Sequence, residues 1–147
     1  MVKVAAPNVI VETFARPLPR LTERNSAFWK GGLNGELLIL RCQACGTYIH
    51  PPVPTCPSCR ATNLAAEAVS GAGTIYSFTV NWYPWVRDIT PPYVVAIIEL
   101  VEQPGLFVTS NLVECHTDDA VIGMQVEVVF AQHDDVYIPL FRPADGQ

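Results

Sequence analysis

The sequence contains little charge of either sign, and its shortage of basic residues argues against one large class of partner. Only 16% of the 147 residues are charged, and among the nine lysines and arginines no three are adjacent. Phosphate backbones are bound chiefly by clustered Lys and Arg side chains. A chain with a formal net charge of −5 and no basic cluster is therefore not expected to bind nucleic acid.

Long apolar runs are also missing, although half of the residues are hydrophobic. The longest run, residues 93–98, suits a buried strand and is far too short to span a bilayer. Residues 1–7 lack the apolar core of a signal peptide. We expect no membrane partner, and the combination of low charge and high hydrophobicity predicts that another protein covers some apolar surface.

Motifs of catalysis are absent as well. The sequence has no Gly-x-Ser-x-Gly elbow, phosphate loop or dinucleotide fingerprint. Cys115 and His116 are adjacent, so on a strand they would point to opposite faces and could not form a thiolate–imidazole pair. The aspartate pairs at 118–119 and 134–135 are typical of turns. We expect no catalytic residue in this chain.

What the sequence does contain is two Cys-x-x-Cys pairs separated by ten residues: Cys42, Cys45, Cys56 and Cys59. Each pair can form a tight knuckle that directs two thiolates at one point, and two facing knuckles give the tetrahedral four-sulfur site of structural zinc. Gly46 follows the first pair, where a knuckle needs positive φ, and Pro57 stiffens the second. Four thiolates leave no open position for water, so the zinc is expected to stabilise the fold rather than to do chemistry.

Other interpretations of these cysteines are two disulfides, four unrelated thiols or a redox pair. A redox pair opens a helix in a βαβ unit, and no such context surrounds either motif. Iron could replace zinc, because the spacing does not exclude it. His50 is not expected to be a ligand, since the four cysteines complete the shell. Four metal-bound cysteines and a lone Cys115 fit a reducing cytoplasm.

The N-terminal third is expected to contain an arm and one helix. Prolines make residues 1–20 an extended arm, which is either a disordered tail or a segment laid along a partner. Residues 23–30 predict a short helix capped by Thr22 and stopped by Gly31 and Gly32. So short a helix must pack on something, through Phe28 and Trp29.

The rest of the chain is expected to be β-structure. Strands at 36–41 and 48–50 flank the first knuckle and form a zinc ribbon. Alternating or apolar segments then predict five strands, with one helical turn capped by Thr117 between the third and the fourth; the strands are residues 74–82, 93–101, 106–113, 124–130 and 136–141. That count and that helix predict an OB-fold barrel, whereas an immunoglobulin-like sandwich needs about seven strands. The expected divisions are 1–20, 21–66 and 67–147.

An aromatic loop joins the first two barrel strands, at a place where OB folds bind ligands. Aromatic and Arg side chains anchor protein interfaces, so we expect this loop and the helix to bind a partner through Phe28, Trp29, Tyr83, Trp85, Arg87 and Tyr93. Trp82 and Tyr93 could instead belong to the barrel core. In the first strand, Tyr76, Phe78, Val80 and Trp82 are expected to share one face.

Several short motifs together resemble one known family across residues 22–141. They are Phe28-Trp29, Gly32-Leu33, Gly35, residues 41–46, Pro51-Pro52, residues 56–59, residues 70–76, Pro92-Tyr93 and Ile122-Gly123. The family, one of the numbered families of domains of unknown function, pairs an N-terminal helix and a rubredoxin-like zinc ribbon with a C-terminal OB fold. Its pattern often has Arg after the paired prolines, where this chain has Val53.

The resemblance implies an accessory role. Similar proteins accompany thiolase-like enzymes that act on acyl-CoA, and some are fused to or assemble with hot-dog-fold enoyl-CoA hydratases. In bacterial steroid side-chain breakdown, the thiolase-like subunit performs a retro-aldol cleavage of a β-hydroxyacyl-CoA and carries the catalytic groups. We therefore expect an accessory subunit, with a single-stranded nucleic-acid-binding module and a small independent enzyme as alternatives.

Overall fold

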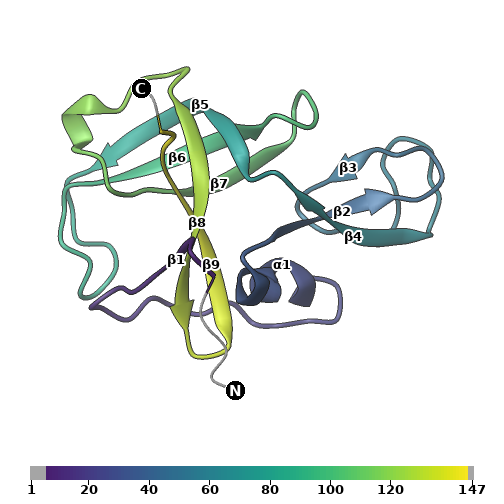
Figure 1. Ribbon diagram of the computed structural model, residues 1–147, viewed down its shortest axis with the longest axis horizontal. Coiled ribbons are helices and arrows are strands. Elements are labelled where there is room, and N and C mark those ends of the chain that lie inside the picture. The colour runs from purple at the N-terminus through teal and green to yellow at the C-terminus, as the bar shows by residue number, and fades with distance from the viewer. Residues whose placement is uncertain (1–5, 146–147) are drawn as a thin grey trace.

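The structure, a computed structural model, describes residues 6–145. A closed β-barrel forms one lobe and a three-stranded sheet forms the other, with helix α1 (Ser26–Lys30) packed against strands of both (Figure 1). Residues 1–5 of the expected arm and residues 146–147 of the expected barrel segment lie outside the described residues. Within the part that is described, no helix is long and apolar enough to cross a membrane.

The barrel has the five strands that the sequence predicts. They are β5 (Ala72–Asn81), β6 (Tyr93–Leu100), β7 (Phe107–Leu112), β8 (Gln125–His133) and β9 (Val136–Pro143). Their order is β8-β5-β6-β7-β9, and pairing of β8 with β9 closes the barrel. The 3₁₀ helix η2 (Thr117–Asp119) lies between β7 and β8, capped by His116 rather than Thr117. This arrangement confirms the OB fold.

A β-bulge in β5 corrects the predicted strand faces. The pairing of β5 with β6 shifts between Ile75 and Ser77, which leaves Tyr76 as the extra residue. Tyr76 is exposed and packs on Phe107, with ring centroids 4.7 Å apart, while Ile75 is buried. A bulge reverses the side-chain alternation, so Tyr76 and Phe78 do not share a face as the uninterrupted pattern predicted.

The second sheet has the order β3-β2-β4 and contains β2 (Leu37–Cys42), β3 (Tyr48–Ile49) and β4 (Leu64–Val69). Strand β4 was not predicted, because its alanines are poor strand formers. It forms through pairing with every residue of β2. The β6–β7 turn joins this sheet to the barrel: Gln103 exchanges side-chain hydrogen bonds with the backbone of Tyr48, at 2.9 and 3.0 Å.

The helical segment differs from its prediction at its N-terminal end. Helix α1 begins at Ser26 and ends at Lys30, the predicted last residue, and the chain then continues through Gly31 and Gly32 as the 3₁₀ helix η1 (Gly31–Asn34), which is capped by Gly35 with φ +72°. A Cβ on Gly32 would lie 2.4 Å from the Cβ of Tyr137, so this glycine permits close packing on the barrel. Phe28 is 7% exposed and belongs to the core.

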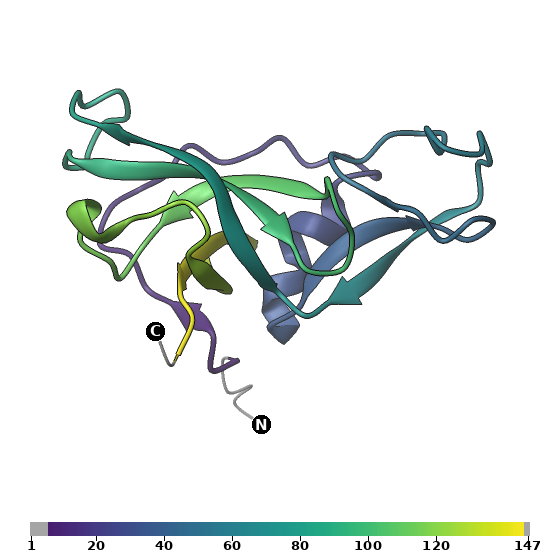
Figure 2. The same cartoon turned by 90° about the horizontal axis from the view of Figure 1, so that it is seen from above.

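The arm is extended, as predicted, but it lies on the chain's own barrel. Strand β1 (Val9–Ile10) pairs in parallel with β8, and the Asn8 side chain donates a hydrogen bond to the Gly35 carbonyl at 3.0 Å. In Figure 2 the arm continues from β1 along the barrel before it reaches α1.

A nearly buried ionic network fixes the middle of the arm. Arg16 donates two hydrogen bonds to the Glu12 carboxylate, at 2.6 and 2.8 Å, and a third to Asn111 Oδ1 at 2.7 Å. His133 Nε2 lies 2.9 Å from Glu12 Oε1. Burial by itself would raise the pKa of Glu12, but the hydrogen bonds and charges of Arg16 and His133 outweigh it and hold that pKa below its ordinary value.

The network predicts an acid-dependent loss of stability. Because the pKa of Glu12 is lowered in the folded state, its contribution is complete above the ordinary carboxyl pKa and is lost as the pH falls through the folded value. We expect Glu12→Gln to lower the free energy of unfolding by about 1–3 kcal/mol at pH 7. Urea unfolding at several pH values should show this difference shrinking toward pH 3.

The matched control is Glu114→Gln, which removes a half-exposed carboxylate paired with Arg142. Exposed ion pairs contribute at most about 1 kcal/mol, so this variant should differ little from the wild type. Equal stability of Glu12→Gln and wild type at pH 7 would contradict the interpretation.

Candidate metal centre and partner-binding loop

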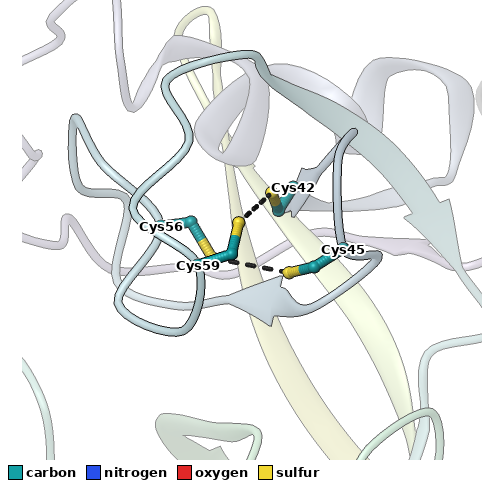
Figure 3. Close-up of side chains that lie close together, drawn as sticks. All are labelled: Cys42, Cys45, Cys56 and Cys59. Atoms are coloured by element: carbon teal, nitrogen blue, oxygen red, sulfur yellow. Dashed lines mark hydrogen bonds between the residues drawn. The ribbon is translucent and has the colours of Figure 1, made fainter.

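The four predicted cysteines converge on one point. Their sulfur atoms all lie within 4.8 Å of one another, as Figure 3 shows. Cys42 Sγ is 3.6 Å from Cys59 Sγ, and Cys45 Sγ is 3.7 Å from Cys56 Sγ. Sulfurs at about 2.3 Å from a tetrahedral zinc ion lie about 3.8 Å apart, so the spacing fits zinc directly and the ligand set is the predicted one.

The two knuckles have the same backbone geometry. In the first, the amide of Cys42 donates to Thr47 O and the amide of Gly46 donates to Cys42 O, both at 2.9 Å. In the second, Cys56 bonds to Ala61 O and Arg60 to Cys56 O, also at 2.9 Å. Arg60 therefore occupies the position of Gly46, and its φ of +65° resembles the +80° of that glycine.

Neighbouring side chains support the first knuckle. Arg41 Nε donates to the Gly46 carbonyl at 2.9 Å, and its guanidinium stacks on the Tyr48 ring at 4.4 Å from the centroid. Arg41 also pairs with Glu67 on β4, at 3.6 Å. These contacts tie the knuckle to all three strands of the sheet and orient its backbone.

The electrostatics of the cluster call for a cation. The hydroxyl of Thr47 lowers the pKa of Cys45 to about 6. The Ala61 amide favours the thiolate of Cys59, but the sulfurs of Cys42, Cys45 and Cys56 outweigh it and raise its pKa to about 12. The Cys59 thiol thus stays protonated beside the Cys45 thiolate unless a metal ion balances the charge. A structural zinc ion held by these four sulfurs supplies that balance.

The other predicted residues do not form a second reactive cluster within the described chain. His50 is mostly buried against the Phe28 ring, 4.6 Å between centroids, and burial lowers its pKa. Burial and then the charge of Asp119 raise the pKa of Cys115, so it is a protonated thiol. The backbone amide of Asp118 donates a hydrogen bond to His116 Nδ1 at 3.3 Å.

The aromatic loop presents its large side chains to solvent. Trp82, Tyr83 and Trp85 are 71%, 62% and 73% exposed, and the rings of Tyr83 and Trp85 pack together with centroids 4.7 Å apart. Trp82 therefore does not belong to the barrel core, which was one of the two expectations for it. Arg87 is exposed, whereas Tyr93 is half-buried.

The remaining predicted partner residues, Phe28, Trp29 and Tyr93, are less exposed than the aromatic side chains of the loop. Phe28 is inside the core, so its side chain is not available to a partner. Trp29 and Tyr93 line one apolar cavity of about 450 Å³, together with Val86 and Ile89 of the loop. The Glu12–Arg16 network at the edge of this cavity was not predicted; the i, i+4 spacing of opposite charges was its only signal, in a segment that is not helical.

Removal of one ligand tests the metal centre. We expect the wild type to bind one zinc ion per chain, which holds the two knuckles together. Cys56→Ser should bind far less zinc, and residues 37–69 should then lose amide-exchange protection. Elemental analysis and hydrogen exchange measure the two effects. Cys115→Ser is the matched control and should retain the zinc; equal zinc content in both variants would contradict the assignment.

The symmetry of the knuckles gives a second test. Arg60→Gly should keep the zinc and raise the free energy of unfolding by up to about 1 kcal/mol, because an L side chain at positive φ is strained. Gly46→Ala should lower it by a similar amount, since its Cβ meets no close contact and only the strain remains. Chemical denaturation of the zinc-loaded proteins measures both effects. A lower free energy of unfolding in Arg60→Gly, or a higher one in Gly46→Ala, would be inconsistent with matching knuckles.

Two family models match consecutive parts of the chain. The ChsH2 rubredoxin-like zinc ribbon domain matches residues 29–65, and the ChsH2 C-terminal OB-fold domain matches residues 66–131. A solved structure described as the Ltp2-ChsH2(DUF35) aldolase is 34% identical, with a TM-score of 0.78; the match covers 86% of this chain and 98% of that one.

Curated relatives fall into two groups. A DUF35 domain-containing scaffold protein of Methanocaldococcus jannaschii is 42% identical over 96 residues, 64% of this chain and 67% of the relative. The 3-oxo-4,17-pregnadiene-20-carboxyl-CoA hydratase alpha subunit of Mycobacterium tuberculosis is 30% identical over 122 residues, 83% of this chain and 39% of the relative. The chain spans about two fifths of the hydratase subunits that it matches, 41% and 39%. With both domain models matched in order and this degree of identity, the chain belongs to the DUF35 family of ChsH2-type proteins.

Proposed function

We propose that this chain is an accessory, non-catalytic subunit that binds and stabilises an acyl-CoA enzyme of the thiolase superfamily. The observation that carries the proposal is the exposed aromatic loop, with Trp82, Tyr83 and Trp85 each more than three-fifths exposed. Large apolar side chains clustered on a surface with little charge are typical of protein interfaces. A solved relative described as the Ltp2-ChsH2(DUF35) aldolase and relatives named as scaffold proteins support the same role.

We further propose that the partner cleaves a β-hydroxyacyl-CoA by retro-aldol chemistry during breakdown of a steroid or lipid side chain. The names of two relatives support this choice, one an aldolase and one a hydratase subunit for a pregnadiene carboxyl-CoA. A hot-dog-fold hydratase is a further proposed member of the assembly. The catalytic groups would lie in the partner, and we place the complex in the cytoplasm.

Within this chain, the proposed roles divide between the two lobes. The four cysteines would hold zinc and so keep the ribbon sheet in shape, while the loop supplies the contact surface. Trp85 and Tyr83 are the proposed anchors. Arg87, exposed in the same loop, and Trp29 and Tyr93, which line the cavity beside the loop, are proposed to contribute further contacts. Phe28 stabilises the core and is left out of the proposed surface.

Binding of single-stranded nucleic acid is the competing function, because OB folds stack bases on aromatic side chains. Two observations disfavour it. The chain has no cluster of basic residues, and its own arm crosses part of the face of β6 and β7, on which OB folds bind oligonucleotides. Salt-sensitive binding of an oligonucleotide in a titration would restore this alternative.

Co-expression with a thiolase-like protein tests the proposal. We expect the two chains to elute together in size-exclusion chromatography, and Trp85→Ala to weaken the complex by at least about tenfold, as truncation of an interface anchor does. Activity on a β-hydroxyacyl-CoA should accompany the complex and be absent from this chain alone. Affinity would be measured by titration calorimetry.

Ile122→Ala is the matched control, because Ile122 is 69% exposed but lies outside the aromatic loop. That variant should bind as the wild type does. Independent elution of the two wild-type chains would contradict the accessory role. An equal loss of affinity in Trp85→Ala and Ile122→Ala would contradict an interface formed by the aromatic loop.

A further inference from the structure

The middle of the arm crosses the barrel without backbone support. We call residues 12–19 the strap. It lies between β1, which pairs with β8, and the turn before α1. Among the described residues, no backbone–backbone hydrogen bond joins the strap to the barrel. Its apolar anchorage is also slight, because Pro17 is exposed and Leu18 is 45% exposed.

The strap is held instead by the ionic network. The side chains of Glu12, Arg16 and His133 are only 8%, 11% and 13% exposed. Arg16 links the strap to β7 through the side chain of Asn111. The side-chain amide of Asn111 in turn donates a hydrogen bond to the Val94 carbonyl of β6 at 2.9 Å. One polar cluster thus connects the strap to β6, β7 and β8, at a single point of its length.

The strap covers a groove that it does not fill. A cavity of about 450 Å³ lies on one side of Arg16 and a second of about 710 Å³ lies on the other. Both are lined by Arg16, Ile89, Tyr93 and Asn111, and every residue of the strap lines one or the other. Arg16 and its partners therefore divide one continuous depression between the strap, the aromatic loop and the barrel.

We infer that residues 12–19 form a latched strap, which the Glu12–Arg16–His133 network holds closed over the outer face of β6 and β7. When the network breaks, the strap swings away between its two anchored ends and the two cavities become one open groove. Local opening is favoured where a segment has few backbone bonds and few buried apolar contacts, and both conditions hold here.

Opening has a consequence for recognition. The uncovered face would expose Trp29, Tyr93 and Val95 beside the aromatic loop, on the side of an OB fold that binds ligands. In the closed state that face is covered by the strap. The latch would thus keep an apolar binding surface covered. This inference does not depend on the identity of the partner in the proposed function.

Hydroxyl-radical footprinting of the full, zinc-loaded chain tests the latch. Glu12→Gln removes the carboxylate that joins Arg16 to His133, and Arg16→Gln removes the link to Asn111. We expect oxidation of Trp29 and Tyr93, which line the groove beside the strap, to rise by about threefold or more in both variants, because opening then breaks fewer charged hydrogen bonds. The core rings of Phe130 and Phe141 should stay unmodified, and every residue of the Glu114→Gln control should be oxidised as in the wild type.

A second readout detects the groove itself. The fluorescent probe 1-anilinonaphthalene-8-sulfonate should bind both latch variants and be excited by energy transfer from tryptophan, whereas the wild type and Glu114→Gln should bind it weakly. Unchanged oxidation of Trp29 and Tyr93 would overturn the inference. So would oxidation of Phe130 and Phe141, because the network would then hold the whole barrel rather than the strap.

Discussion

Convergence of four sulfur atoms is the constraint on which the ribbon lobe depends. The buried core of that lobe consists of Cys42, Ile49 and Cys56, with only a few half-buried neighbours. So small a core cannot offset the entropy of ordering the two knuckles and three strands. Metal binding supplies the missing free energy. The hydrogen bonds between Gln103 and the backbone of Tyr48 then connect the ordered sheet to the barrel.

The barrel lobe follows a different principle, since it closes around a core of its own. Ile75, Ile98, Phe130 and Phe141 are at most 1% exposed, and pairing of β8 with β9 completes the ring of strands. A self-sufficient barrel does not need the aromatic loop for its stability. The cost of keeping Trp82 and Trp85 in water therefore points to use in recognition, which is the reasoning behind an accessory subunit.

The arm and the loop lie on either side of one depression, and this arrangement connects stability with recognition. Polar contacts hold the strap, while apolar side chains of the loop and the barrel line the space beneath it. Segments attached in this way can move without unfolding the domain. The inferred latch would therefore let the surface next to the loop change shape.

The sequence by itself determined the metal ligands, the five barrel strands and the exposed loop, because spacing and alternation are local patterns. Tertiary structure decided the rest. Strand β4 forms only because β2 is there to pair with its alanines, and the bulge at Tyr76 appears only against β6. Gly32 also allows close packing on the barrel, which depends on Tyr137, a residue distant in sequence. Glu12 and Arg16 lie in an arm without strand or helix periodicity, and only the folded chain brings His133 and Asn111 against them; contacts between residues about a hundred positions apart leave no periodic trace in a sequence.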